Sequence, residues 1–402
     1  MGRNSERTEY ELALVSRYEP TRDWPLSFAW SVSNDHVNAL GLPKKGHPSR
    51  QFARRALAAN LYLADSCSLW LSYSRNRNHY SPARRYHGAA YSYGHVLAVV
   101  EELDKASLVV EERAKQGQLG WQSRITVSPK FLQLLPPVSW LSYSPGELVR
   151  LRDSTGKLVD YVDTKRTRMM RRQVAALNEA FESASIRLSS TDTPWVGDTV
   201  VVDSGFVHPA QIAGYRVFNN KWFLGGRFYG PFWQNLSKNR RRDLMIDEAC
   251  VTELDFAQLH PRLLYAEFGA PLVDDAYKIP GREDNRPIVK AAWQMMINAR
   301  SRRSAIMALA TKLGGPPCIS EANTLLTALE ERHHEIQPAF YTGAGLRLQR
   351  VDADLMMSVE QKCLSKGIVA LPVHDSFIVA QGKPAEQVRG IMESELDRIL
   401  DR

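Results

Sequence analysis

Cysteine is scarce in this sequence. The four cysteines, Cys67, Cys250, Cys318 and Cys363, are far apart and include no Cys-x-x-Cys pair. This spacing excludes a disulfide framework and the usual structural zinc sites, and it is typical of a protein in a reducing compartment.

Long apolar runs and a secretion signal are also missing. No run approaches the roughly 18 apolar residues that span a bilayer, and the N-terminus has no charged-then-apolar pattern. We therefore expect a soluble intracellular protein without a membrane partner. Aromatic residues make up 9% of the chain and form no stripe for stacking single strands of nucleic acid.

Positive charge is in excess, and it is clustered. The formal net charge is +8, which favours a polyanionic partner such as nucleic acid. The clusters are Arg240–Arg242, Lys165–Arg172 and Arg300–Arg303. A solvated helix face is the alternative interpretation of each cluster.

Two segments in the second half of the chain each carry one Asp on an apolar stretch. In the first, a strand pattern leads into Asp255, and apolar residues recur at helical spacing from Leu259. In the second, the apolar runs 368–371 and 377–379 flank a hairpin tip that contains Asp375. An ionised carboxylate between apolar strands is costly unless it is paired or binds a cation, so we expect a shared Mg²⁺ site. For either Asp alone, a turn or cap role is the alternative.

From Gly225 to the C-terminus, the order of segments resembles the palm of family A DNA polymerases. This superfamily also contains the phage-type single-subunit RNA polymerases. The matching segments are Gly226-Arg227-Phe228, Trp233-Gln234-Asn235-Leu236, Asp255 to Arg262 (motif A), Arg286 with Lys290 (motif B), Gln349 with Asp354, and Val373-His374-Asp375-Ser376 (motif C). The number and order of these segments favour the resemblance over chance.

The resemblance implies a role for each matched residue. Asp255 and Asp375 would be catalytic and would hold two Mg²⁺ ions, for which Mn²⁺ can substitute. The residues that would bind the incoming nucleotide are Arg286, Lys290, His260 and Gln258. The residues that would bind the primer–template are Arg227, Gln234, Asn235, Gln349, His374, Arg168, Arg171 and Arg172.

The sequence also departs from the family. His260 stands where the DNA enzymes have a Glu that crowds the sugar 2′ position, which leaves the choice between deoxy- and ribonucleotides open. After Lys290 the family has an aromatic residue and then Tyr-Gly, where this chain has Gln294 and Asn298-Ala299. Trp293 could supply the missing ring, but its place on an apolar helix favours a core position.

Residues 1–137 predict a separate, mostly helical module. The expected elements are helices over 52–63 and 95–103 and strands over 108–110 and 124–127, with a turn-rich segment between the strands. This order resembles the winged helices of plasmid replication initiators, which read duplex DNA through the second helix. A winged helix that serves only protein contacts or folding is the alternative, since the candidate recognition helix has few Arg and Lys residues.

Residues 138–220 predict a connecting region with a thumb-like helix. Pro136-Pro137 and Ser144-Pro145-Gly146 mark a linker. A hairpin formed by 147–152 and 157–162 is expected next, and then a basic helix over 165–184. In the family, this position holds a helical thumb that grips duplex DNA through its phosphates.

The predicted fold class is therefore α+β. A winged-helix domain would precede a polymerase right hand, with a helical thumb, a palm over 221–402 and reduced fingers over about 271–345.

The predicted function is template-directed nucleotidyl transfer. We expect a small DNA polymerase that extends a primer by two-metal phosphoryl transfer, without proofreading because no acidic cluster resembles an exonuclease. The expected partners are a DNA duplex or primer–template and nucleoside triphosphates, and the oligomeric state is left open. The expected location is the cytoplasm, with a bacterial or mobile-element origin.

Three alternatives remain open at this stage. The first is an RNA polymerase or primase on the same palm, and the second is a catalytically silent DNA-binding replication or maintenance protein. The third is a metal-dependent nuclease.

Overall fold

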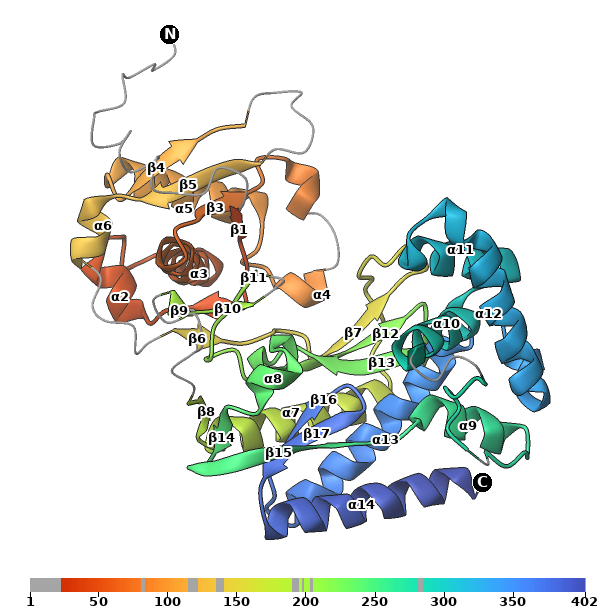
Figure 1. The fold of residues 1–402 in the computed structure, drawn as a ribbon. Coiled ribbons are helices and arrows are strands. Elements are labelled where there is room, and N and C mark those ends of the chain that lie inside the picture. The colour runs from red at the N-terminus through yellow and green to blue at the C-terminus, as the bar shows by residue number, and fades with distance from the viewer. Residues whose placement is uncertain are drawn as a thin grey trace.

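The chain folds into an N-terminal module and a larger C-terminal body (Figure 1). This computed structural model describes residues 23–80, 84–114, 122–134, 141–189, 195–196, 199–202, 205–272, 274–280 and 285–401. Each of the two parts has a large hydrophobic cluster of its own. The described helices include none that is long and apolar enough to cross a membrane.

The N-terminal module is built around one long helix that packs against a four-stranded sheet. The elements are β1 (Asp23–Pro25), β2 (Trp30–Ser31), α2 (Asn34–Ala39), α3 (Pro48–Ser66), β3 (Trp70–Tyr73), η1 (Arg77–Tyr80), α4 (Arg84–His87), α5 (Tyr93–Lys105), β4 (Val109–Glu112), β5 (Ser123–Val127) and α6 (Pro129–Leu134). The strand order is β1-β3-β5-β4, antiparallel except for the β1–β3 pair.

Both helices and both strands predicted in this module are present. Pro48 occupies the first turn of α3, and the Ser92 side chain caps α5 by accepting a hydrogen bond from the backbone of His95. The apolar positions of both helices face the core, which explains why their spacing was informative. The turn-rich segment between β4 and β5 includes residues 115–121, which lie outside the described part of the chain.

A short strand joins the module to the region that follows it. β6 (Ser142–Tyr143) pairs antiparallel with β2, and Tyr143 packs on Trp30 with ring centroids 4.9 Å apart. Of the predicted linker, Pro136-Pro137 lies outside the described residues. Beyond the linker, the chain returns to the N-terminal module, because β6 pairs with β2.

The predicted hairpin over 147–162 is present only next to its turn, and its first arm has a different strand partner. β7 (Val149–Arg152) pairs in parallel with β12 (Tyr215–Asn219), and β12 pairs antiparallel with β13 (Lys221–Tyr229). The second predicted arm meets the first through the bridge Arg152↔Leu158, with hydrogen bonds from the Asp153 amide to the Lys157 carbonyl (2.8 Å) and from the Val159 amide to the Leu151 carbonyl (2.9 Å). The Tyr86 hydroxyl links the two arms through side-chain hydrogen bonds. It donates to the Val159 carbonyl (2.7 Å) and accepts from the Leu151 amide (3.0 Å).

The predicted basic helix is present as α7 (Lys165–Ser183). Thr164 and Thr167 form a capping box at its start. The other described elements of this region are strands: β8 (Ile186–Leu188), β9 (Trp195–Val196), β10 (Thr199–Val202) and β11 (Gly205–Val207). In the described part of 138–220, α7 is thus accompanied by strands and not by further helices.

The C-terminal body is organised on a five-stranded antiparallel sheet in the order β16-β17-β15-β14-β8. Its elements are η2 (Phe232–Asn235), α8 (Lys238–Arg241), β14 (Leu244–Ile246), β15 (Ala249–Asp255), α9 (Leu259–Glu267), α13 (Gly345–Ser365), β16 (Ala370–Val373), β17 (Ser376–Ala380) and α14 (Lys383–Leu400). α14 contacts β15 and β17, and α13 contacts β16 and β13. The strand, helix and hairpin predicted around the two Asp residues are confirmed.

A helical subdomain stands beside the sheet, at the right of Figure 1. It consists of α10 (Arg286–Asn298), α11 (Arg302–Leu313), η4 (Pro316–Cys318), α12 (Ile319–Arg332) and η5 (His334–Ala339). Trp293 is fully buried in its core and packs edge-on against Tyr277, as its sequence context favoured.

Candidate active site

Asp255 and Asp375 lie side by side although they are far apart in the sequence. Asp255 is the last residue of β15 and is paired with Ser376 of β17. Asp375 belongs to the two-residue tip between β16 and β17, where His374 adopts a left-handed backbone conformation (φ 57°). The Phe256 amide donates to the Asp375 carbonyl at 3.4 Å, which ties the two strand ends together.

The two carboxylates influence each other. The pKa of Asp255 is raised, first by partial removal from water and second by the negative charge of Asp375; Lys238 and Lys290 act in the opposite direction. Asp255 itself is exposed, so both groups are accessible at the strand ends and are not enclosed between strands. Two like charges held together at an accessible edge favour the binding of a cation.

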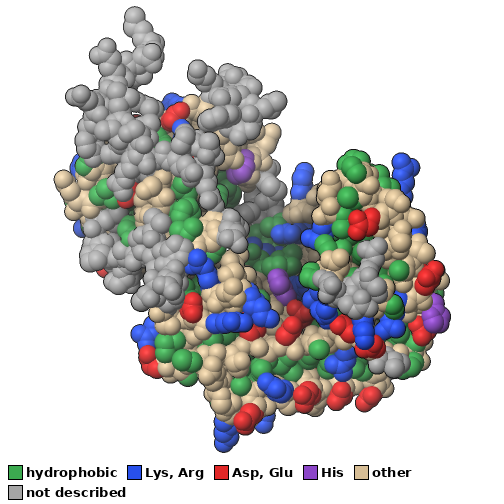
Figure 2. Space-filling model, viewed as in Figure 1, with side chains coloured by type: hydrophobic (Ala, Val, Ile, Leu, Met, Phe, Trp, Pro, Cys, Tyr) green, Lys and Arg blue, Asp and Glu red, His purple; other side chains and the backbone are tan. Residues whose placement is uncertain are grey.

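A cleft of about 560 Å³ collects most of the predicted site residues. Those that line it are Arg227, Asp255, Gln258, His260, Arg286, Lys290, Gln349, His374 and Asp375. Figure 2 shows that the molecule is hollowed between the N-terminal module and the helical subdomain, and that Lys, Arg and His side chains gather there. The fold therefore brings together residues from β13, α9, α10, α13 and the β16–β17 tip.

The start of α10 lines the same cleft as the two carboxylates. Arg286 and Lys290 are four residues apart, so they lie on one face of the helix, and both are exposed. Arg286 forms an ion pair with Asp275 (2.8 Å), and both cations lie over the ring of Tyr277, at 5.1 and 5.8 Å from its centroid. The Tyr277 ring thus helps to hold two positive charges in the cleft.

A buried carboxylate connects two further cleft residues. Arg227 donates from Nε (3.0 Å) and Nη2 (2.5 Å) to Oδ2 of Asp352, and the same oxygen lies 3.2 Å from His260 Nε2. The Asp352 side chain is fully buried, and its Oδ1 has no hydrogen-bond partner among the described residues. Asp352 consequently fixes the orientation of both Arg227 and His260.

His374 projects from the strand tip near the same group. Its ring lies 6.3 Å from that of Tyr229, and its pKa is lowered, first by desolvation and then by the charge of Arg227. A neutral imidazole next to Asp375 can accept or donate a single hydrogen bond without adding charge to the cleft.

The Gln258 side chain is hydrogen-bonded to the segment that precedes α10. Its backbone is left-handed (φ 55°), and its Oε1 accepts a hydrogen bond from the Ala276 amide (2.6 Å). The residue therefore anchors the segment that carries Tyr277 in addition to lining the cleft.

Two matched residues have side chains that are already engaged elsewhere. Gln234 donates from Nε2 to the carbonyls of Phe228 (3.2 Å) and Pro372 (3.0 Å), which links η2 to β16. Asp354 pairs with Arg216 (3.1 Å) and Arg350, away from the residues that line the cleft. Asn235 is exposed at the end of η2 and is not among the lining residues.

The three arginines predicted on α7 are not equivalent. Arg171 is bound to Glu147 (2.9 Å) and Asp163 (2.9 Å), so its guanidinium holds the 147–163 segment in place. Arg168 and Arg172 are exposed on the helix. Only the latter two are accessible for phosphate contacts.

Asp255 and Asp375 suit Mg²⁺, which takes part of its ligands from substrate and water. They suit less well a metal ion whose ligands all come from protein side chains. Among the described residues, no group of three or more His, Cys, Asp or Glu side chains could hold a metal ion. Mg²⁺ is commonly bound by one or two carboxylates together with substrate phosphates and water, and the two Asp side chains match that pattern.

Sequence reasoning missed two residues that line the cleft, Tyr277 and Gly345, and the buried Asp352 that orients Arg227 and His260. Tyr277 lies in a segment without a periodic pattern, and Asp352 was passed over for Asp354. The helical spacing from Gln349 carried a signal, because Asp352 is three residues further along α13 and so lies on nearly the same face. Gly345 also lines the cleft, and a Cβ at that position would overlap with the Asn298 carboxamide.

Comparisons with known proteins add little to this description. No protein-family model and no curated protein sequence matches the chain. One similar solved structure is the polymerase domain of Pol1 from M. smegmatis in complex with DNA primer-template and dNTP. It has a TM-score of 0.34 and 13% identity over 58% of this chain. The match spans about half (49%) of that structure, and similarity at this level is too low to define the fold.

Proposed function

We propose that this chain is a template-directed nucleotidyltransferase, and most specifically a small DNA polymerase without proofreading. The observation that supports this is that Asp255 and Asp375 line one cleft together with Arg286 and Lys290. The two carboxylates can bind metal ions and the two cations can bind phosphates, so together they match a nucleoside triphosphate with its metal ions.

Asp255 and Asp375 would hold two Mg²⁺ ions. When bound, these ions supply Lewis acidity that lowers the pKa of the primer 3′-hydroxyl and neutralises charge on the triphosphate. Lys290 and Arg286 would bind the phosphates from α10, Lys as a point charge and Arg as a planar fork. Because Arg286 is paired with Asp275, it must exchange that partner for a phosphate or bind both.

The remaining cleft residues would position the nucleic acid and the sugar. Arg227, Gln349 and His374 would contact the primer–template, and His260 and Gln258 would lie next to the incoming nucleotide. The domains we propose are an N-terminal DNA-binding module over 1–137, a connecting region over 138–220, and a palm over 221–402 with reduced fingers.

The N-terminal module supports the DNA-binding part of the proposal through its topology. From α3 onward, its order is helix, strand, short helix, helix and a two-stranded ladder, with β3 beside β5. We propose that this is a winged helix and that α5 is its recognition helix.

Primer extension on a DNA template with Mg²⁺ tests the activity. We expect the wild-type protein to extend the primer and Asp375→Asn to lose at least a thousandfold in rate, because the variant lacks one of two metal-binding carboxylates. Asp35→Asn, a matched change at an exposed position on α2, should leave the rate unchanged. Failure of the wild-type protein to extend any primer while it still binds duplex DNA would favour the catalytically silent alternative.

RNA synthesis is the second candidate, and one observation favours it. His260, whose ring is held by Asp352, occupies the position of the sugar-discriminating Glu in the resemblance. Parallel reactions with dNTPs and rNTPs decide between the two polymerases. A nuclease on the same carboxylates is disfavoured, because it would have no triphosphate for Arg286 and Lys290 to bind.

A further inference from the structure

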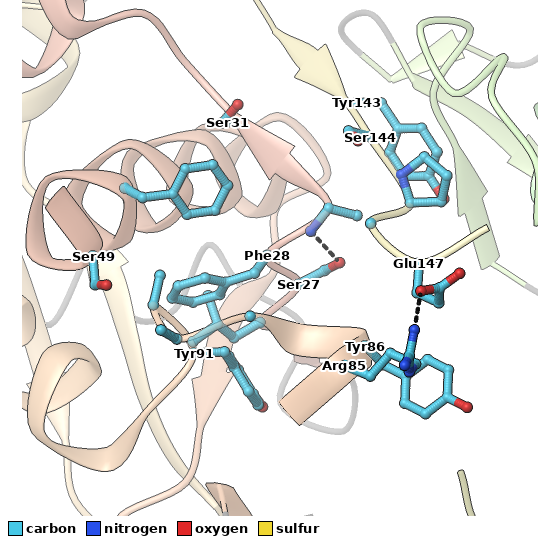
Figure 3. Close-up of a pocket in the computed structure, with 18 of the residues that line it drawn as sticks. Ser27, Phe28, Ser31, Ser49, Arg85, Tyr86, Tyr91, Tyr143, Ser144 and Glu147 are labelled. Atoms are coloured by element: carbon cyan, nitrogen blue, oxygen red, sulfur yellow. Dashed lines mark hydrogen bonds and ion pairs between the residues drawn. The ribbon is translucent and has the colours of Figure 1, made fainter. Parts of the chain in front are cut away.

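A second cavity, of about 930 Å³, lies where the N-terminal module meets β6 and β7 (Figure 3). Its lining comes from the segment between β1 and β2, the start of α3, the segment between α4 and α5, and the chain from β6 to β7. It shares no lining residue with the candidate active site. A cavity of this size can hold a ligand of one or two nucleotide units.

Aromatic rings from three different elements form one wall. Phe28 packs edge-on against Tyr91 with centroids 5.0 Å apart, and it lies 6.0 Å from Phe52 of α3. All three side chains are only partly buried, so they present ring surface to the cavity. In Figure 3 the labelled Phe28 and Tyr91 lie together on one side, and Tyr143 and Tyr86 lie across from them.

The opposite wall carries a positive charge that no carboxylate balances. Arg150 stacks on the ring of Tyr215 with its guanidinium carbon 3.4 Å from the centroid. Its Nε and Nη2 donate to the carbonyls of Glu147 (3.1 Å) and Pro145 (2.5 Å). Within the described residues, Arg150 has no ion pair, and desolvation lowers the pKa of its guanidinium.

The one acidic residue in the described lining does not cancel this charge. Glu147 is bound by Arg85 (3.1 Å) from inside the cavity wall and by Arg171 (2.9 Å) from α7. The carboxylate is therefore already compensated twice, and the cavity keeps a positive potential from Arg150. The serine hydroxyls of Ser31, Ser49 and Ser144 add hydrogen-bonding groups along the rim (Figure 3).

We propose that this cavity binds an unpaired nucleotide of single-stranded nucleic acid, with the base against the wall of Phe28, Phe52 and Tyr91 and the phosphate near Arg150. Aromatic rings bind bases of any sequence by stacking, and a guanidinium binds the phosphate. The sequence shows no stripe of rings, because these rings come from separate elements that only the fold brings together. The site does not depend on the proposed catalytic activity.

Charge favours a nucleotide over a segment of protein as the occupant. The chain has a net charge of +8, and a second copy would bring a surface of the same sign to the cavity. An anionic strand instead gains from both Arg150 and the overall field.

Fluorescence anisotropy with labelled single strands tests the site, in EDTA and without triphosphates, so that the result is independent of catalysis. The probes are a 12-nucleotide oligo(dT) and an abasic strand of the same length. We expect the full-length protein to bind oligo(dT) at least about fivefold more tightly, because only that strand has bases to stack. Phe52→Ala should bring the two affinities together, whereas Phe223→Ala, an exposed aromatic on β13, should preserve the difference.

A second variant keeps the test valid if Phe52→Ala does not fold. Ala89 is exposed on the cavity rim, so Ala89→Glu adds a negative charge there without disturbing the core, and it should weaken binding of both strands severalfold. Equal affinity of the wild-type protein for the two strands would overturn the proposal. Unchanged strand binding in both Phe52→Ala and Ala89→Glu would also overturn it. So would a loss of self-association in Ala89→Glu with strand binding intact, because that result would place a protein segment in the cavity.

Discussion

At the scale of single residues, three aspartates in one region have two different tasks. Asp255 and Asp375 are accessible at strand ends, where their mutual repulsion leaves them ready for cations. Asp352 is fully buried and neutralises Arg227 while it orients His260. The chemical type of a residue is the same in all three cases, and the surroundings decide the role.

Replacement of Asp352 should be costly to stability. Among the described residues, Asp352 is the one carboxylate that pairs with Arg227, so Asp352→Ala breaks one half of a buried ion pair. This should lower the free energy of unfolding by about 3 kcal/mol. Urea denaturation measures this, with Asp104→Ala on an exposed helix face as the control. Asp352→Asn should recover part of the loss, because the amide oxygen still accepts from Arg227; equal losses in both Asp352 variants would contradict the ion-pair interpretation.

Replacement of Asp255 should have the opposite effect on stability. Since the folded protein raises the pKa of this carboxyl, the folded state favours the protonated form. The group therefore stabilises the fold at low pH and loses that contribution as the pH rises through its folded-state pKa. At neutral pH without metal, Asp255→Asn should raise the melting temperature by at most about 2 °C, since the group is exposed and its field is screened.

Differential scanning calorimetry in EDTA at pH 5 and pH 8 checks this expectation. The gain in the variant should be larger at pH 8, and Mg²⁺ should stabilise the wild-type protein more than the variant. A variant that is less stable than the wild type at pH 8 would show that Asp255 is held by a favourable contact and not strained by Asp375.

At the scale of elements, the sequence predicted the helices and strands whose residues follow a local apolar pattern. β15, α9 and the β16–β17 hairpin were predictable because apolar periodicity and a short tip mark each of them. The pairing of β7 was not, because its partner β12 comes more than sixty positions later and leaves no local signal. Asp352 and Tyr277 were missed for a similar reason, since their partners Arg227, Arg286 and Lys290 lie in other elements.

The junction of α10 and α13 depends on the absence of a side chain at Gly345. A Cβ there would overlap with the Asn298 carboxamide, so Gly345→Ala must push the two helices apart or rotate Asn298. Overpacking of this kind costs about 1–3 kcal/mol. We also expect weaker primer extension, because both residues line the cleft.

Thermal denaturation of a double-mutant cycle isolates this contact. Asn298→Ala should be nearly neutral alone and should restore most of the stability of Gly345→Ala, because it removes the overlapping group. Additive losses in the double variant would mean that Gly345 is needed for another reason.

At the scale of the whole molecule, α4 fastens the N-terminal module to the body. Arg85 forms an ion pair with Glu147 (3.1 Å), donates to the Tyr161 carbonyl (2.9 Å) and lies 4.2 Å from the centroid of the Tyr161 ring. These contacts cross between segments that share no strand ladder. The position of the module relative to the cleft therefore depends on these side chains as well as on the β2–β6 ladder.

Arg85→Ala should loosen this junction. Loss of a charge-assisted hydrogen bond and a cation–π contact should cost about 2 kcal/mol, and limited proteolysis should cut the 153–163 segment faster than in the wild type. Arg113→Ala removes an exposed ion pair with Glu111 and should change the cleavage rate little. Equal rates for all three proteins would mean that Arg171 alone holds the segment.

The pairing of β15 with β17 also has a consequence for the time course of folding. This ladder joins positions separated by more than a hundred residues, with the helical subdomain and α13 in between. Closing so long a loop is entropically costly, and contacts of high sequence separation form slowly. During refolding, helical structure should thus return early, whereas the two aspartates should meet, and Mg²⁺ affinity should recover, only in a late phase.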